Sequence, residues 1–361
     1  MPDSIERDDL ASEDADAVKK RPIIVPRFND WSGPAKVRAI AVLLVVIVVS
    51  WGFAGSNYRN ASTPNGPAEA RGAVSSDNGF DVSNAIIPKH FIRRGGPPRD
   101  GIPAILEPNF IPAADVTYLK ETDEVLGFIH EGEAHAYPLR ILVWHEIAND
   151  TVGGLPIAAT YCPLCGTCMV FSREYGGETL TFGVSGLLYQ SDVLMYDHQT
   201  ESLWSQLMMK SISGEHVDTE LAWLDSKQMT WAAWKQQFPD SMVMSTDTGF
   251  GRNYARAAYE SYKNSDRVMF PVPETRTELG RKEWVLGVVI GDEAKAFPIA
   301  ELSGLELPLE DTIGGQNVIV MFDVEAQFAS VVTDTGDPVP SVKVYWFAWQ
   351  GFYPDTSLYA P

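Results

Sequence analysis

Cysteine is scarce in this chain: only three occur among 361 residues, and all of them lie between Cys162 and Cys168. A metal site made only of cysteine needs four sulfurs, usually from two separate Cys-x-x-Cys pairs. A second pair is missing, so one chain cannot complete such a site. A ferredoxin-type cluster is also disfavoured, because Ser172 stands where the fourth cysteine would be required. Any bound metal must therefore find nitrogen or thioether ligands elsewhere in the chain, or ligands from a second subunit.

Positive charge is the second shortage. The chain has 28 lysines and arginines against 48 acidic residues, which gives a net charge of −20 and a pI near 4.6. An acidic surface repels phosphate backbones, so nucleic-acid binding is excluded. The same acidity is also typical of proteins from saline habitats. Hydrophobic residues make up 45% of the chain, which is enough for a sizeable core and about two domains.

The N-terminal part changes character three times. Residues 1–38 begin with a strongly acidic stretch and become basic, and we expect a disordered cytoplasmic tail. Residues 39–55 are an uncharged run of 17 residues, which predicts a single transmembrane anchor with the N-terminus inside. Residues 56–80 have the composition of a linker. The prediction is a single-pass protein of the cytoplasmic membrane whose folded part is periplasmic. A cleaved signal peptide is the alternative.

The remainder of the chain contains an internal repeat. Six of thirteen positions are identical between its longest matching pair of stretches, and two further pairs follow in the same order. The pairs are Leu126–Pro138 with Leu286–Pro298, Asp150–Gly154 with Asp311–Gly315, and Trp231–Trp234 with Trp346–Trp349. Alternating strands around turns predict β-hairpins in both copies. We therefore expect a β-rich α+β fold with two related lobes from an internal duplication, residues 81–275 and the shorter 276–361.

The cysteines form the turn Cys-Pro-Leu-Cys-Gly, which has the local form of a metal-binding knuckle between two strands. Aligning the two copies places Asp323 opposite Cys162 and Ala326 opposite Cys165. The second copy thus keeps the scaffold without the sulfurs. Residues needed only for folding should survive in both copies, so this pattern favours special chemistry in the first lobe.

Three further residues are candidate ligands. His145 lies in the stretch 141–149, which reads as a short helix, and its imidazole has no counterpart in the second copy. Met195 offers a thioether, and Cys168 offers a third sulfur. Thiolates with an imidazole and a thioether suit copper, whereas cysteine and histidine alone suit zinc. We predict a site of Cys162, Cys165, His145, Met195 and Cys168, with copper preferred over zinc. Glu146 and Asp150 could orient an imidazole or simply shape the chain.

Several longer motifs accompany the cysteine turn. They are residues 95–103 (GGPPRDGIP), 134–142 (AHAYPLRIL), 144–150 (WHEIAND), 162–167 (CPLCGT), 182–187 (FGVSGL), 194–197 (LMYD) and 202–206 (SLWSQ). With the N-terminal anchor, this set resembles the bacterial and archaeal family catalogued as domain of unknown function 3179, over roughly residues 90–361. The resemblance implies an extracytoplasmic location. Members usually carry a small residue where Cys168 stands, which makes Cys168 the weakest of the sulfur candidates.

Two alternatives to a metal site remain open on the sequence. Cys162 and Cys165 could form a thiol–disulfide redox pair, although such a pair usually opens a helix and strand-like residues follow here. They could also form one structural disulfide in a non-catalytic binding scaffold. The sequence names no substrate, reaction or protein partner.

Overall fold

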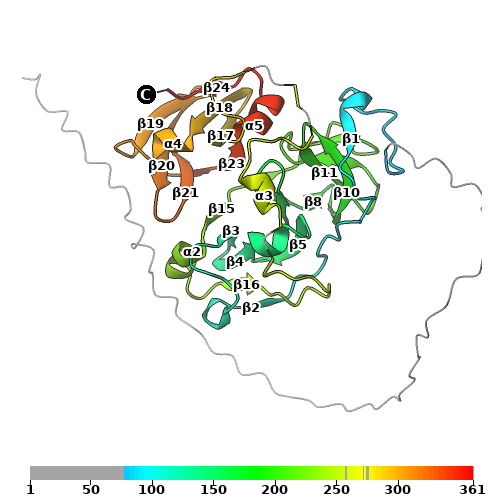
Figure 1. Ribbon diagram of the computed structural model, residues 1–361, viewed down its shortest axis with the longest axis horizontal. Helices are drawn as coiled ribbons and strands as arrows, with labels where there is room; N and C mark the ends of the chain where they lie inside the picture. Colours follow the sequence, from blue (N-terminus) through cyan, green and yellow to red (C-terminus); the bar gives the residue numbers. More distant parts are fainter. Residues whose placement is uncertain (1–76, 257, 271, 274–275, 361) are drawn as a thin grey trace, which may run out of the picture. The chain divides into compact units, whose positions relative to one another are not determined.

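The structure is a computed structural model that describes residues 77–256, 258–270, 272–273 and 276–360 (Figure 1). Mostly antiparallel sheets dominate it, so the β-rich prediction is confirmed. In spatial order, the sheets of the earlier part are β1 (Ile92–Arg94), β10 (Phe182–Tyr189), β11 (Asp192–Asp197), β12 (Leu203–Ser205) and β13 (Lys210–Ser213); β14 (Trp223–Leu224), β7 (Thr167–Ser172), β6 (Leu155–Cys162) and β5 (Ile147–Val152); and β15 (Lys227–Thr230), β3 (Glu124–His130), β4 (Glu133–Pro138), β16 (Met242–Met244) and β2 (Phe110–Pro112).

Two further four-stranded sheets follow, and a small hairpin lies in the earlier part. They are β23 (Ser341–Tyr345), β17 (Trp284–Ile290), β18 (Glu293–Pro298) and β24 (Ser357–Leu358); β19 (Leu309–Ile313), β20 (Gln316–Asp323), β21 (Phe328–Thr333) and β22 (Pro338–Val339); and the hairpin β8 (Glu174–Tyr175) and β9 (Glu178–Thr179). The helices are short: α1 (Leu139–Leu142), α2 (Trp231–Gln237), α3 (Glu260–Lys263), α4 (Ile299–Leu302), α5 (Trp346–Phe352), and the 3-10 turns η1 (Lys89–Phe91) and η2 (Ala113–Asp115).

Residues 124–172, the first segment, and residues 284–333, the second segment, have the same strand order. Each contains a hairpin, a four-residue helix and a three-stranded meander. Each first hairpin also gains an antiparallel strand on one side, β15 or β23, and a parallel strand on the other, β16 or β24. Matching sequence patterns therefore fold into matching topologies.

A glycine–tryptophan contact explains part of the repeated sequence. A Cβ atom at Gly127 would lie 1.9 Å from Trp234 Cζ3, and one at Gly287 would lie 2.3 Å from Trp349 Cζ3. In both copies a helix after the added strand places its indole flat against the hairpin. Both indoles are buried, and each N–H donates to a hydroxyl seven residues later. The repeated tryptophans are thus core residues, and their hairpin glycines are required by close packing.

The two copies differ by one insertion. Strands β8–β13 lie between β7 and β14, whereas β21 and β22 are joined directly by a short turn. The inserted sheet packs on one face of β5–β7, where Phe182 and Trp204 share a buried cluster with Ala158 and Phe171. The other face of β5–β7 packs against the first hairpin in a second cluster. Consequently, the first three-stranded meander is covered on both faces.

The predicted tail, anchor and most of the linker lie outside the described residues. Within the described part, none of the helices has the length and apolar character needed to cross a bilayer. Phe80, at the end of the predicted linker, is buried, and Asn78 donates a hydrogen bond to the Ser185 carbonyl over 3.0 Å. The folded part therefore includes the last residues of the predicted linker.

Candidate metal site

The cysteine turn joins β6 to β7. Cys162 is the last residue of β6 and is paired with Thr167, the first of β7. The turn is closed by a hydrogen bond of 2.8 Å from the Gly166 N–H to the Cys162 carbonyl. Gly166 has a φ of +75°, which glycine adopts without strain. The strand–turn–strand prediction for this motif is confirmed.

The second segment supports the turn from outside. The Tyr345 N–H donates to the Cys165 carbonyl over 3.0 Å. A Cβ atom at Gly166 would lie only 2.4 Å from Trp284 Cη2, so the indole rests directly on the glycine. The conformation that brings the two sulfurs together thus depends on residues more than a hundred positions further along the chain.

Cys162, Cys165 and Asp192 form a compact cluster. One sulfur from each cysteine and one carboxylate oxygen of Asp192 all lie within 4.8 Å of one another, and all three residues are buried. The cysteines are free thiols. Asp192 opens β11 of the inserted sheet, directly after Gln190 and Ser191, which both have a positive φ. Tertiary packing therefore delivers a carboxylate to the sulfurs from a separate sheet.

The Asp192 carboxylate is only partly satisfied. Its Oδ2 accepts a hydrogen bond of 3.0 Å from the Leu207 N–H, whereas its buried Oδ1 has no hydrogen-bond partner. An unsatisfied buried carboxylate oxygen is costly, and a metal ion would satisfy it. Two thiolates and a carboxylate are a donor set that zinc accepts. On donor chemistry and spacing, these residues fit a metal ion.

Burial also shifts the acid–base properties of this region. It raises the pKa of Asp192 to about 7 and the pKa of the neighbouring Glu146 to about 8. Burial likewise raises the pKa of the Cys162 and Cys165 thiols. The principal causes of these four shifts include no lysine or arginine. Four acidic groups therefore share a buried region whose main influences include no positive charge, and a bound cation would stabilise their ionised forms.

Glu146 reaches this region through the strand pairing. Its carbonyl accepts a hydrogen bond of 2.7 Å from the Tyr161 N–H, which places Glu146 beside the end of β6. Its φ of +59° ends the helical turn, and β5 begins at the next residue. The predicted helix 141–149 is therefore wrong in extent: α1 ends at Leu142, because the chain must turn there to enter the sheet.

His145 lies in the turn after α1 and is fully buried. Its Nδ1 is 2.8 Å from the Pro103 carbonyl and its Nε2 is 2.7 Å from the Tyr254 hydroxyl. Burial lowers the pKa of this imidazole, which favours the neutral form. The three-residue cluster does not include His145. A ligand role for His145 stays a prediction, and coordination by it would require breaking one of these hydrogen bonds.

The other two predicted ligands lie in different surroundings. Met195 is buried on β11, opposite Val184 and Trp204, and belongs to the same hydrophobic cluster as Cys162 and Cys165. Cys168 belongs to the cluster on the opposite face of β6 and β7. It lines a small cavity, of about 20 Å³, together with Lys343. Strand alternation explains the separation, because Cys168 follows Thr167 and points to the other face.

The sequence analysis missed Asp192. Nothing in its local sequence marks it as a ligand, because it reads as an ordinary residue after a tight turn. Its unpartnered oxygen and its position beside the sulfurs appear only once the inserted sheet is packed on β6.

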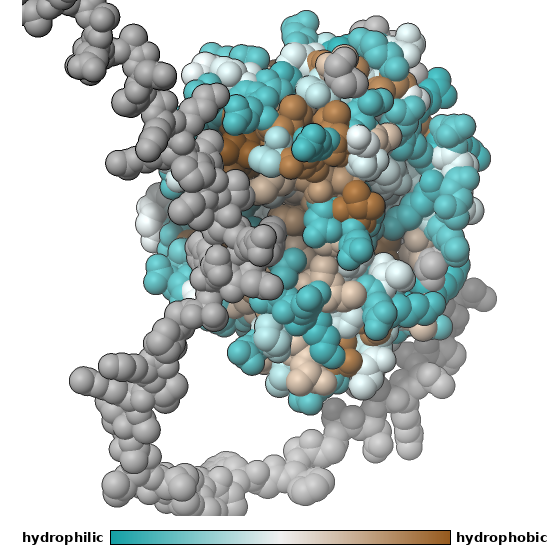
Figure 2. Space-filling model, turned by 90° about the vertical axis from the view of Figure 1, so that its left-hand side faces the viewer, coloured by the Kyte–Doolittle hydropathy of each residue, from teal (hydrophilic) through white to brown (hydrophobic). Residues whose placement is uncertain are grey.

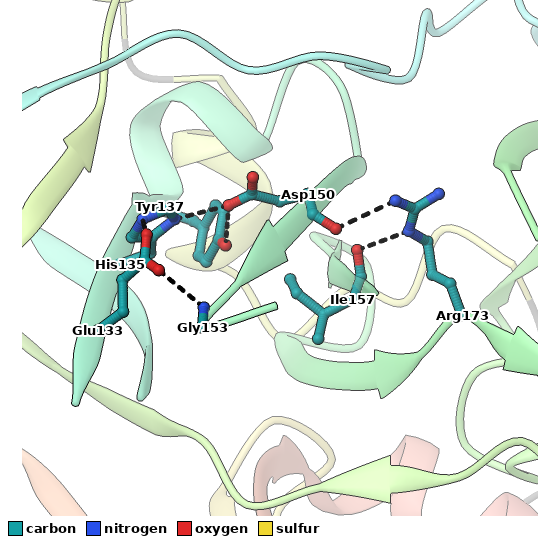
Figure 3. A network of polar contacts seen from close by, with 7 residues as sticks. All are labelled: Glu133, His135, Tyr137, Asp150, Gly153, Ile157 and Arg173. Carbon is teal, nitrogen blue, oxygen red and sulfur yellow. Dashed lines mark hydrogen bonds and ion pairs between the residues drawn. The ribbon is translucent and has the colours of Figure 1, made fainter. Parts of the chain in front are cut away.

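A second buried polar network lies in the first segment (Figure 3). His135 Nδ1 is 2.7 Å from Asp150 Oδ2, and its Nε2 is 2.8 Å from Glu133 Oε1. The Tyr137 hydroxyl donates to the same Asp150 oxygen over 2.6 Å, and the Gly153 N–H donates to Glu133. Figure 3 shows these side chains converging between β4 and the β5–β6 turn.

The second segment repeats this network with a different cation. Lys295 stands in place of His135 and forms an ion pair of 2.7 Å with Asp311. Glu293 accepts from the Gly314 N–H, as Glu133 does from Gly153. Because the arrangement occurs in both copies, it stabilises the hairpin–meander contact and is not a candidate for the special chemistry of the first lobe.

Comparison with known proteins gives one match. The family model described as "Protein of unknown function (DUF3179)" matches residues 99–336, which is more than half of the chain. The chain belongs to the DUF3179 family. The resemblance read from the motifs is therefore confirmed. Neither the curated proteins nor the solved structures contain a match. The DUF3179 match covers the cysteine turn, the inserted sheet and most of the second segment.

Proposed function

We propose that this DUF3179 protein is a membrane-anchored, periplasmic metal protein that holds one transition-metal ion at Cys162, Cys165 and Asp192. The observation that carries the proposal is the mutual spacing of the three donor atoms, all within 4.8 Å, with one carboxylate oxygen unsatisfied. A bound ion would act as a Lewis acid in this enclosed site.

Zinc is the metal that this donor set favours. A carboxylate is a hard ligand, whereas the earlier preference for copper rested on the thioether of Met195. Copper therefore depends on Met195 entering the coordination sphere. Cys162 and Cys165 would bind as thiolates, and Asp192 would bind through the oxygen that lacks a partner. Glu146, protonated near neutral pH in the metal-free site, would exchange a proton there.

A thiol–disulfide function is less well supported. Redox-active cysteines are usually exposed and have a lowered pKa. Here both thiols are buried and burial raises their pKa. The duplication supports a functional role for the site rather than a structural one. We infer that the two segments arose from one ancestral unit, and the second keeps the same strand order with Asp323 and Ala326 at the cysteine positions.

Metal analysis of the full-length protein, purified from membranes, tests the proposal. We expect one zinc ion per chain in the wild type, and its loss in Cys165→Ser and in Asp192→Asn. Cys168→Ser is the matched control, because Cys168 lies in the other cluster, and it should retain the metal. Metal retained in both site variants, or a wild-type mass showing two protons lost to a disulfide, would contradict the proposal.

A further inference from the structure

The outer face of the meander β5–β7 is covered by the chain itself. Ala158, Met169 and Phe171 on this face are 0–1% exposed and share a cluster with residues of the inserted sheet. Asn149 lies in the same row and fixes that sheet: its side chain accepts from the Phe182 N–H over 2.8 Å and donates to the Phe182 carbonyl over 2.9 Å. Apolar contact and a polar anchor thus act together.

The equivalent face of the second meander, β19–β21, has no such cover. Strand pairing places Ile319 beside Val332 and Met321 beside Ser330, as Ala158 is beside Phe171 and Thr160 beside Met169. Ile319, Met321 and Val332 are half-buried, and none of them belongs to the five buried clusters of the described residues. We call Ile319, Met321 and Val332, with Glu310 beside them, the open face.

The open face lies on an acidic part of the molecule. Residues 303–342 contain seven aspartates and glutamates and no lysine, arginine or histidine. Figure 2 views the molecule from the side on which β19–β21 lie in Figure 1, and shows apolar side chains at the surface among hydrophilic ones. Glu310 is exposed and pairs with Ile319, the position equivalent to Asn149. An ionised carboxylate only accepts hydrogen bonds, so its partner must be a donor.

We propose that the open face binds another protein, through an apolar surface that carries a lysine or arginine opposite Glu310. The partner would take the place that the inserted sheet takes in the first segment. Anionic lipid headgroups fit this face poorly, because its border is acidic. A second copy of this chain fits poorly for the same reason, since two identical acidic borders would repel each other.

Photo-crosslinking in the native host identifies what lies on the open face. Full-length protein would carry p-benzoylphenylalanine at position 332, or at position 324 as control. Val324 is 53% exposed and lies in the β20–β21 turn, away from the open face. We expect an adduct only from position 332, with a partner whose crosslinked peptide lies next to lysine or arginine. Adducts only with a second copy or with lipid, equal adducts from both positions, or no adduct would overturn the proposal.

Binding of a defined probe tests the chemistry independently. The probe is a synthetic β-hairpin with an apolar face and a lysine border, compared with the same hairpin bordered by glutamate. We expect the full-length protein to bind the lysine form, Val332→Asp to weaken binding at least about tenfold, and Glu310→Gln to weaken it about threefold or more. Val324→Asp should bind as the wild type does. Equal binding of the two hairpins, or equal loss in Val324→Asp and Val332→Asp, would overturn the proposal. Both tests are independent of the metal site.

Discussion

The His135 network predicts that the stability of the first segment decreases as the pH rises. Burial acts to lower the pKa of His135, but its hydrogen bonds to Asp150 and Glu133 outweigh this and leave the pKa raised. The imidazolium donates to both carboxylates. The neutral ring has one N–H only, so one carboxylate then faces a nitrogen lone pair. Stability from the raised pKa is fully present below about pH 6.5 and is lost as the pH rises through the folded-state pKa.

The size of the effect follows from the contacts. The His135 side chain is 7% exposed, so solvent screens the two contacts of 2.7 and 2.8 Å only weakly. A hydrogen bond to a charged group contributes about 1.5–3 kcal/mol, and deprotonation removes one of the two. We therefore expect the free energy of unfolding to fall by about 1–3 kcal/mol between pH 6 and the high-pH limit of this titration.

The second segment supplies the matched variant. His135→Lys introduces the residue that pairs with Asp311 at the equivalent position, and a lysine stays protonated across this pH range. Urea unfolding of both proteins at several pH values gives the difference in unfolding free energy, and NMR titration gives the imidazole pKa. The wild type should lose stability relative to His135→Lys as the pH rises. A difference that is constant or grows with pH, or an imidazole pKa at or below about 6.5, would refute the reasoning.

Three further outcomes are expected. Gly166→Ala should lower zinc affinity and cost about 1–3 kcal/mol of stability, because its Cβ would lie 2.4 Å from Trp284 Cη2; Gly291→Ala, with open space around it and a φ of +59°, measures the backbone strain alone, and an equal effect of the two changes would contradict the contact. Zinc affinity should rise at least about tenfold per pH unit below pH 7, since the metal displaces a proton from Asp192, whose pKa is raised to about 7, and a flat profile by competitive chelation would exclude it as a ligand. A periplasm-specific reporter fused after Gly55 should be active, and activity only of a cytoplasmic reporter would reverse the predicted orientation.

The sequence by itself determined the local framework. The Cys162–Cys165 turn, the hairpin at 126–138 and its copy at 286–298 depend on glycine positions and strand alternation, which are properties of neighbouring residues. The repeated spacing also predicted that the two segments share one strand order. The family membership was likewise readable, because it depends on motifs and not on their contacts.

Only the tertiary structure decided which groups meet. Asp192 reaches Cys162 and Cys165 because the inserted sheet packs on β6, and no local pattern encodes that contact. His145 was predicted to face the sulfurs, yet its two ring nitrogens contact Pro103 and Tyr254, which are 42 and 109 residues away in the chain. Sequence spacing fixes the direction of a side chain relative to its own strand. The contact that it makes there depends on which distant element packs on that face, and a single chain pattern does not specify it.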